Sequence, residues 1–135
     1  MSLSVRTAAP AARLACEALE DRATPAAALA LSAAGLVAFD TARPGDATTT
    51  AVTGVGATET LVGIDFRAAD GQLYALGVDA AADKATLYTV SLDTGAATAV
   101  GAPGAVAFTD AAGKPVDLPA APAGYALAFD PATGQ

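Results

Sequence analysis

Short runs of alternating apolar and polar residues recur along most of this chain, and turn-forming residues separate them. In Thr60–Arg67 the apolar side chains Val62, Ile64 and Phe66 fall on one face, because successive side chains of a strand point to opposite faces of its sheet. Thr86–Leu92 repeats the pattern, whereas no stretch shows the i, i+3, i+4, i+7 spacing of an amphipathic helix. The pattern therefore predicts an all-β domain of antiparallel hairpins in a meander.

Turn chemistry predicts how these strands are connected. Asp70-Gly71 is expected to form a two-residue hairpin, because both residue types tolerate a positive φ. Asp93-Thr94-Gly95 is a second turn, and glycine or proline recurs every several residues. We expect about nine strands. Besides the two above, they include a hairpin within Ala26–Phe39 and strands over Gln72–Gly77, Ala96–Val100 and Tyr125–Phe129.

The hydrophobic content overstates the core that this chain can build. Hydrophobic residues make up 53% of the 135 residues, but 39 residues are alanine. Leu, Ile, Val and Phe together number 28, about 21% of the chain, close to the ~20% below which disorder is expected. The length therefore fits one domain with a small core.

The chain divides near residue 25. Residues 1–25 carry three basic and three acidic groups, so the net charge of −7 belongs to the rest of the chain, which holds 4 basic and 11 acidic residues. Residues 1–25 lack the ~7–15-residue apolar stretch of a secretory signal. We predict a mobile leader over 1–25, in which Cys16 is an incidental thiol, and an all-β domain over 26–135.

The end of this leader carries a short motif. The run Leu19–Ala26, LEDRATPA, resembles the LE-x-R-x-x-P-A leader at the start of many exported or surface proteins in some bacteria. The resemblance implies export, and therefore an extracellular or cell-surface location.

Two pairs of segments in the domain repeat weakly. Gly63–Gln72 is similar to Ala126–Gln135 at an offset of 63 residues, and Leu36–Val55 is similar to Leu87–Val106 at an offset of 51. A four-stranded unit of ~40–50 residues has the size of a β-propeller blade. The sequence therefore predicts a partial propeller-like fold of about two four-stranded blades.

The segment Leu36–Gly101 resembles the bacterial domain-of-unknown-function family 4394. The resemblance rests on Leu36–Asp40, Glu59–Arg67, Gly71–Gly77, Leu87–Val90 and Thr94–Gly101. It implies a propeller-like domain in an exported protein and assigns no catalytic residues. Domains of that family continue beyond the point where this chain stops, so the resemblance implies a truncated chain.

One turn resembles the Asp-box of propeller blades, S-x-D-x-G-x-x-T. Ser91, Asp93, Gly95 and Thr98 occupy its four defined positions. In such a turn the carboxylate accepts backbone N–H groups and the glycine takes a positive φ. We therefore interpret these residues, like Asp70 and Gly71, as structural turn residues.

The acidic residues raise the question of calcium, which needs six to eight oxygen ligands. Asp79 and Asp83 flank an expected loop of three alanines and are the candidate ligands. The alternative is that both are solvated turn carboxylates, since aspartate is common in turns. We expect no cofactor, with calcium as the one candidate.

A pair of carboxylates also forms the catalytic residues of a glycosidase, which holds the two groups ~5–9.5 Å apart. Glu59 and Asp65 are the pair to consider, because they frame the stretch that resembles the family. Asp65 and Arg67 fall on the same strand face, so an ion pair between them is the alternative. With no tryptophan to form a sugar platform, Glu59, Asp65 and Arg67 remain surface candidates.

Charge and composition restrict the partners. The negative charge argues against nucleic acid and anionic membranes, and no segment has the ~20 apolar residues of a membrane span. Without histidine, Ser-His-Asp and Cys-His chemistry is excluded. We expect a non-catalytic binding or structural module for an unknown protein or carbohydrate. The alternative is a fragment of a propeller enzyme, and an open sheet edge predicts self-association.

Overall fold

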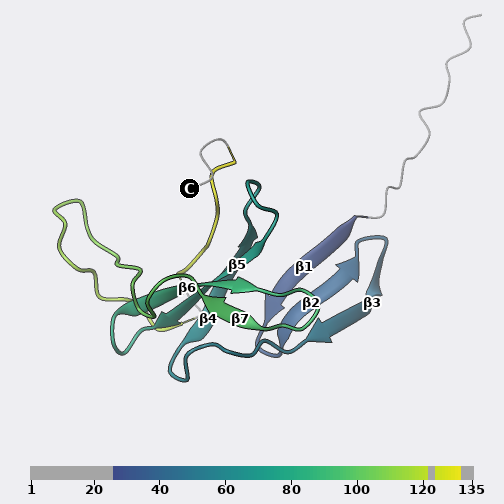
Figure 1. Cartoon of the computed structure of the whole chain (residues 1–135), viewed down its shortest axis with the longest axis horizontal. Coiled ribbons are helices and arrows are strands. Elements are labelled where there is room, and N and C mark those ends of the chain that lie inside the picture. Colours follow the sequence, from purple (N-terminus) through teal and green to yellow (C-terminus); the bar gives the residue numbers. More distant parts are fainter. Residues whose placement is uncertain (1–25, 122–123, 132–135) are drawn as a thin grey trace, which may run out of the picture.

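The computed structural model describes residues 26–121 and 124–131. The leader predicted over residues 1–25, which includes Cys16 and all but the last residue of the LE-x-R-x-x-P-A motif, lies outside these residues. The described part contains seven strands and no helix (Figure 1), so the predicted all-β fold is confirmed. The strands are β1 (Ala27–Ser32), β2 (Gly35–Asp40), β3 (Arg43–Thr50), β4 (Thr60–Phe66), β5 (Leu73–Asp79), β6 (Lys84–Val90) and β7 (Ala97–Ala99).

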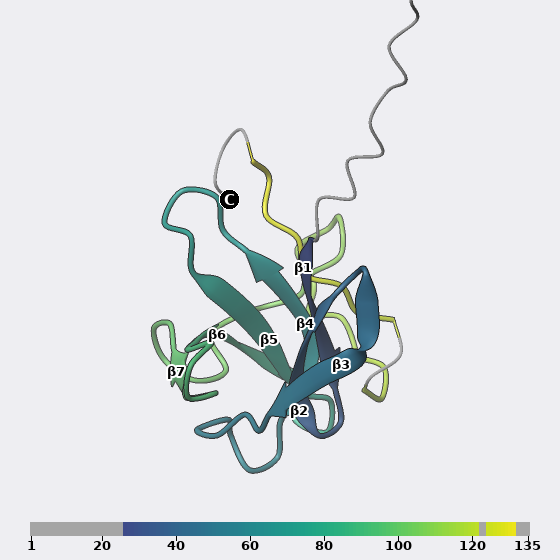
Figure 2. The same cartoon turned by 90° about the vertical axis from the view of Figure 1, so that its right-hand side faces the viewer.

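The strands form two consecutive antiparallel meanders. The first sheet has the order β1-β2-β3 and the second the order β4-β5-β6-β7. Their first strands, β1 and β4, contact each other (Figure 2). This is a partial propeller-like arrangement, but its first sheet has three strands where four were expected.

In the part of the chain that the structure describes, no fourth strand joins the first sheet, because the chain leaves that sheet after β3. The connector of residues 51–59 instead runs beside the hairpin between β6 and β7. The Thr53 N–H donates to the carbonyl of Gly95 at 3.0 Å, and the Ala97 N–H donates to the carbonyl of Thr53 at 2.8 Å. The connector thus fastens the first sheet to the second.

The hairpins of the second sheet have four-residue loops, not the two-residue turn expected at Asp70-Gly71. The Gly71 N–H donates to the carbonyl of Arg67 at 2.8 Å, and only Gly71 of the expected pair has a positive φ, 67°. The last loop position has a positive φ in all three hairpins, with Asp83 at 52° and Gly95 at 72°. The hydrogen bond from the Gly71 N–H to the Arg67 carbonyl sets the length of the loop. The residue pair Asp70-Gly71 alone does not specify that bond.

Asp83 is the one non-glycine residue with a positive φ in the described part of the chain. Its carboxylate accepts the N–H of Leu118 at 2.9 Å. Asp83→Ala is expected to lower the free energy of unfolding by ~2 kcal/mol, through backbone strain and an unpaired amide. Asp83→Asn should change it by less than ~0.5 kcal/mol, because asparagine tolerates this φ and keeps an acceptor oxygen. Urea unfolding followed by circular dichroism measures both, and equal stability of the alanine variant and wild type would contradict this role.

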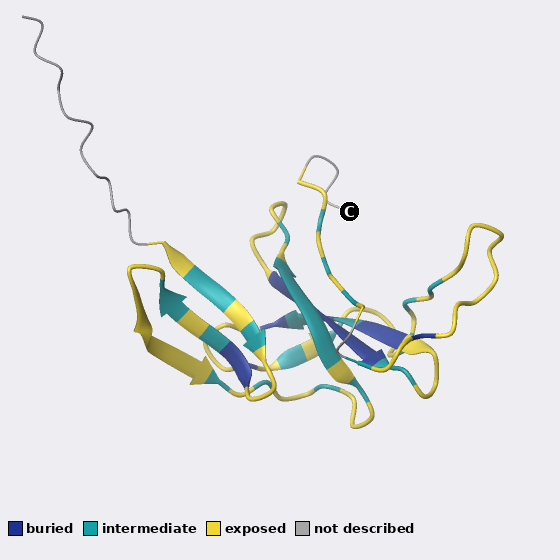
Figure 3. Ribbon diagram, turned by 180° about the vertical axis from the view of Figure 1, so that it is seen from behind, coloured by how far each residue is buried: buried dark blue, intermediate teal, exposed yellow. Residues whose placement is uncertain are grey.

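The core has two parts, one on each face of the second sheet. β5 is buried along nearly its whole length, whereas β3 is almost entirely exposed (Figure 3). The first cluster, between the two sheets, contains Leu36, Leu73, Ala75, Tyr88 and Val90. The second, on the opposite face, contains Leu76, Val78, Ala85 and Leu118.

The strand expected over Tyr125–Phe129 does not form in the described residues. The segment is extended and its side chains alternate in burial as predicted, but it joins no sheet. The Phe129 N–H donates to Asp65 Oδ2 at 2.7 Å, and the Phe129 ring packs edge-on against Tyr74 at 5.0 Å. Side-chain contacts therefore hold this segment where a ladder was expected.

Within residues 26–121 and 124–131, β3 pairs with β2 alone and so forms an open edge of the first sheet. Pro44 and the charged residues Arg43 and Asp46 lie in its first half, and such residues oppose pairing with another chain. Self-association therefore stays a prediction, and this half of β3 is poorly suited to it.

Candidate functional site

Glu59 ends the connector and lies immediately before β4, where its N–H closes a turn on the carbonyl of Gly56 at 3.0 Å. Its half-buried side chain crosses β5 at Gly77, where a Cβ atom would stand 2.8 Å from Glu59 Oε2. The carboxylate reaches two hydroxyl groups of β6. Thr86 Oγ1 donates to Oε1 at 2.5 Å, and the Tyr88 hydroxyl donates to Oε2.

The two hydroxyl groups also accept hydrogen bonds. The Gly56 N–H donates to the Tyr88 hydroxyl at 3.0 Å, and the Gly104 N–H donates to Thr86 Oγ1 at 2.7 Å. Thr86 is 1% and Tyr88 3% exposed, and no buried side-chain oxygen or nitrogen in the described residues lacks a partner. We call Glu59, Thr86 and Tyr88 the Glu59 network; it joins the connector, β6 and the loop after β7.

Burial and the hydrogen bond to Glu59 raise the pKa of Tyr88. A raised folded-state pKa means that the contribution of the neutral hydroxyl to stability is complete below pH ~10, the unfolded value, and is lost as the pH rises through the folded value. The difference in unfolding free energy between wild type and Tyr88→Phe should therefore stay constant up to pH ~10 and shrink as the pH rises further. Urea titrations at several pH values measure it, and a constant difference would contradict the shift. The raised pKa of Tyr125 is common to both proteins and cancels.

Asp65 and Arg67 do not form the expected ion pair. Asp65 accepts the N–H groups of Phe66 at 2.9 Å and of Phe129 at 2.7 Å. Arg67 pairs with Asp70 at 3.2 Å. The correction has a local reason, because the four-residue loop brings Asp70 back toward Arg67 while Asp65 faces the C-terminal segment.

Glu59 and Asp65 are not placed as a glycosidase pair. Six residues of extended chain separate them along β4, which corresponds to roughly 20 Å, whereas the reaction needs carboxylates within ~9.5 Å. Both carboxylates also accept hydrogen bonds from other parts of the chain. Both carboxylates thus hold separate parts of the chain together.

Asp70 and Gly71 serve the loop between β4 and β5. The Asp70 carboxylate accepts the N–H of Gln72 at 3.1 Å and the hydroxyl of Tyr74 at 2.9 Å, besides its pair with Arg67. These interactions, the Gln72 N–H first, lower the pKa of Asp70. The carboxylate thereby fixes the start of β5.

Asp79 and Asp83 lie at the two ends of the loop between β5 and β6. Asp79 accepts the hydroxyl of Thr58 at 2.6 Å and the N–H groups of Ala81 and Ala82, each at 3.1 Å, and these hydrogen bonds, that of Thr58 first, lower the pKa of Asp79. Among the described residues, no three of the His, Cys, Asp or Glu type gather closely enough to hold a metal ion. The carboxylates proposed as calcium ligands therefore have partners within the chain.

Chelation is expected to leave the thermal stability unchanged. A protein loaded with calcium and then treated with excess EDTA should keep its Tm, because the oxygens of Asp79 already accept hydrogen bonds. A thermal melt with and without EDTA measures this, and magnesium-loaded protein is the control. A fall of several degrees on chelation of calcium alone would contradict it.

The Asp-box-like turn is held differently from the expectation. Ser91 Oγ accepts the N–H of Thr94 and Thr94 Oγ1 accepts that of Ala96, each at 3.3 Å. Within the described residues the Asp93 carboxylate makes no hydrogen bond, and exposed Thr98 lies in β7. Gly95 has the expected positive φ. The hydroxyl groups of Ser91 and Thr94 therefore accept the backbone N–H groups of the turn, the role that was expected of the Asp93 carboxylate.

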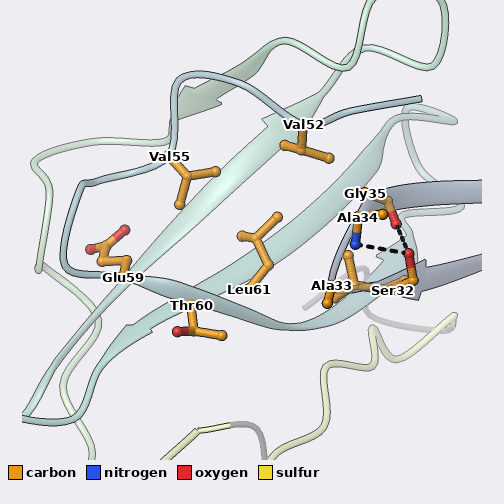
Figure 4. A pocket seen from close by; sticks show the side chains of 10 residues that line it. Ser32, Ala33, Ala34, Gly35, Val52, Val55, Glu59, Thr60 and Leu61 are labelled. Carbon is orange, nitrogen blue, oxygen red and sulfur yellow. Dashed lines mark hydrogen bonds between the residues drawn. The ribbon is translucent and has the colours of Figure 1, made fainter. Parts of the chain in front are cut away.

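A hollow that the sequence did not reveal lies between the β1–β2 turn and β4. Its volume is about 260 Å³. Val52 and Val55 of the connector point toward Leu61 of β4, the turn of residues 32–35 closes one end, and Glu59 lies at the other (Figure 4). A second hollow of about 380 Å³ continues along β4 to Gly63. The apolar residues at the start of β4 were the one sequence signal for this hollow. The connector and the turn are rich in small residues, which give no such signal.

A comparison with known protein families agrees with the family resemblance seen in the sequence. A family model described as "Domain of unknown function (DUF4394)" matches residues 35–123, about two thirds of the chain. No curated protein and no solved structure matches. In the part of the chain that the structure describes, no helix is long and apolar enough to span a membrane. The resemblance is confirmed: the chain belongs to the DUF4394 family.

Proposed function

We propose that this domain is a non-catalytic binding and structural module of an exported or cell-surface bacterial protein. One observation carries the proposal. Each acidic residue that the sequence made a candidate for catalysis or metal binding accepts hydrogen bonds from the chain itself; these residues are Glu59, Asp65, Asp79 and Asp83. Such carboxylates fix loops and segments, and a general acid or base needs a reacting proton within reach instead.

The hollows beside β4 support the binding part of the proposal. They are concave, lie between two sheets and have mainly small and aliphatic linings, as expected of a recognition site. They fall at the contact between β1 and β4, the first strands of the two sheets. The location outside the cell is supported by the leader motif at Leu19–Ala26.

A turnover assay tests the proposal. The purified chain is incubated with a broad panel of chromogenic glycosides and esters, alongside Glu59→Gln as the matched variant. We expect no turnover by either protein. Turnover by wild type that disappears in a folded Glu59→Gln variant would contradict the proposal and favour an enzyme.

A further inference from the structure

The two hollows form one elongated site between two strand edges. Both are lined by Leu31, Ser32 and Ala33 at the end of β1 and by Thr60 and Leu61 at the start of β4. In the described residues β1 pairs only with β2, and β4 pairs only with β5. Each strand therefore has one edge without a ladder partner, which is where an extended segment of another chain can bind.

The lining selects the chemistry of the occupant. Its apolar side chains are aliphatic, namely Leu31, Val52, Val55 and Leu61 in the first hollow. Neither lining contains an aromatic side chain, whereas the apolar sites of sugars and nucleobases are typically built on aromatic faces. An aliphatic side chain matches these walls better than a sugar ring does.

The charge around the hollows favours basic residues at the two ends of the segment that binds there. The linings contain no lysine or arginine, and Glu59 is their one ionisable residue. Asp79 lies beside the same connector through its hydrogen bond with Thr58. Residues 26–135 carry 11 acidic and 4 basic groups, so the surrounding field favours a cationic partner and disfavours an anionic one.

We propose that this site binds an extended peptide segment that carries an aliphatic side chain flanked by lysine or arginine. The aliphatic side chain enters the hollow between Val55 and Leu61, and the peptide backbone lies along the start of β4. The register shift in the β4–β5 ladder between Leu61 and Gly63 bends β4 at that point, since a bulged strand bends, so the peptide backbone is expected to follow β4 only over the residues before it. This inference rests on the proposed function and names its ligand class.

The test is an NMR titration of the isotope-labelled full chain with capped pentapeptides. The probes are Lys-Val-Leu-Val-Lys, its glutamate-flanked counterpart Glu-Val-Leu-Val-Glu, and the polar counterpart Lys-Ser-Gly-Ser-Lys, with maltose as the sugar probe. We expect the first peptide alone to bind, with amide shifts at Ser32, Ala33 and Thr60. Its affinity should fall several-fold between about 50 and 500 mM salt, because added salt screens the charges.

Two variants and one control localise the binding. Ala33→Phe fills the hollow from an exposed turn, and Thr60→Arg adds a positive charge at its rim. Each should weaken binding at least about tenfold, equivalent to ~1.4 kcal/mol. Ala42→Phe changes an alanine of the next hairpin turn, outside both linings, and should bind as wild type does. Well-dispersed spectra show that each variant is folded.

Several outcomes would overturn the inference. They are no binding by any probe, equal binding of the glutamate-flanked or polar peptide, amide shifts away from the hollows, or unchanged binding by folded Ala33→Phe and Thr60→Arg. Maltose binding at the same amides would overturn the peptide class and leave a binding module standing. The proposed function fails separately, through turnover in the assay above.

Discussion

Gly95→Ala is expected to lower the free energy of unfolding by ~4 kcal/mol, a large share of the 5–15 kcal/mol of a typical domain. Gly95 is buried and has a φ of 72°, which an L side chain rarely adopts. An added Cβ would also stand 2.1 Å from the carbonyl oxygen of Ala51 in the connector. The two atoms nearest to this Cβ, the carbonyl oxygen and carbon of Ala51, belong to the backbone. The clash can therefore be relieved only by moving the connector away from the second sheet.

Gly71→Ala is the matched control for this prediction. Gly71 occupies the same position of the same kind of four-residue loop, with a φ of 67°, but an added Cβ would have no neighbour within 4 Å. The expected loss is therefore only ~1 kcal/mol, the cost of the backbone conformation itself. Urea unfolding of both variants separates strain from close approach, and equal losses would show that the contact with the connector is unimportant.

Tyr88→Phe is expected to cost ~2–3 kcal/mol, the second largest effect. The substitution removes one hydroxyl that donates to Glu59 and accepts from the Gly56 N–H, while the ring keeps its place in the core. A half-buried carboxylate and a backbone N–H then each lose a partner, and unmade hydrogen bonds of this kind cost ~1–3 kcal/mol. Thr86→Val should act similarly, since it removes the partner of Glu59 Oε1 and of the Gly104 N–H.

Tyr125→Phe is the control for the tyrosine variant. Its hydroxyl donates to the carbonyl of Pro119 at 2.6 Å in an exposed position, where water can replace the lost partner. The expected loss is below ~1 kcal/mol. Losses of the same size for Tyr88→Phe and Tyr125→Phe, measured by urea unfolding, would contradict a special role of the Glu59 network.

Alternation predicted most of the strands because it is a local signal. Val62, Ile64 and Phe66 marked β4, and the apolar run around Leu36 marked the β1–β2 hairpin. The single face expected for the β4 residues was wrong, because the register shift between Leu61 and Gly63 puts Val62 against the second cluster and Ile64 against the first. The hairpin at Asp70-Gly71 was located correctly but given the wrong length, because the bond from Gly71 N–H to the Arg67 carbonyl leaves no trace in the residue types. Short-range patterns thus identified the positions of the turns, but they did not identify the length of each loop or the hydrogen bond that closes it.

The candidate site was predictable only in part, because its partners are distant in sequence. Glu59 stood out within the family-like stretch, but Tyr88 lies 29 residues away and Phe129 lies 64 residues from Asp65. No spacing rule connects residues so far apart. The final segment near Phe129 carried a strand pattern, but among the described residues it lies against β4 at Gly63 without joining a sheet, and contacts with Asp65 and Tyr74 hold it.

A double-mutant cycle between Glu59→Gln and Tyr88→Phe tests most directly whether Glu59 is a structural anchor. The free energies of unfolding of wild type, both single variants and the double variant are measured in urea at pH 7. Because the two side chains are in direct contact, we predict a coupling energy of ~1–2 kcal/mol, within the range found for hydrogen-bonded neighbours. Additive effects would contradict the account, since they would mean that the hydrogen bond between Tyr88 and the Glu59 carboxylate does not stabilise the fold.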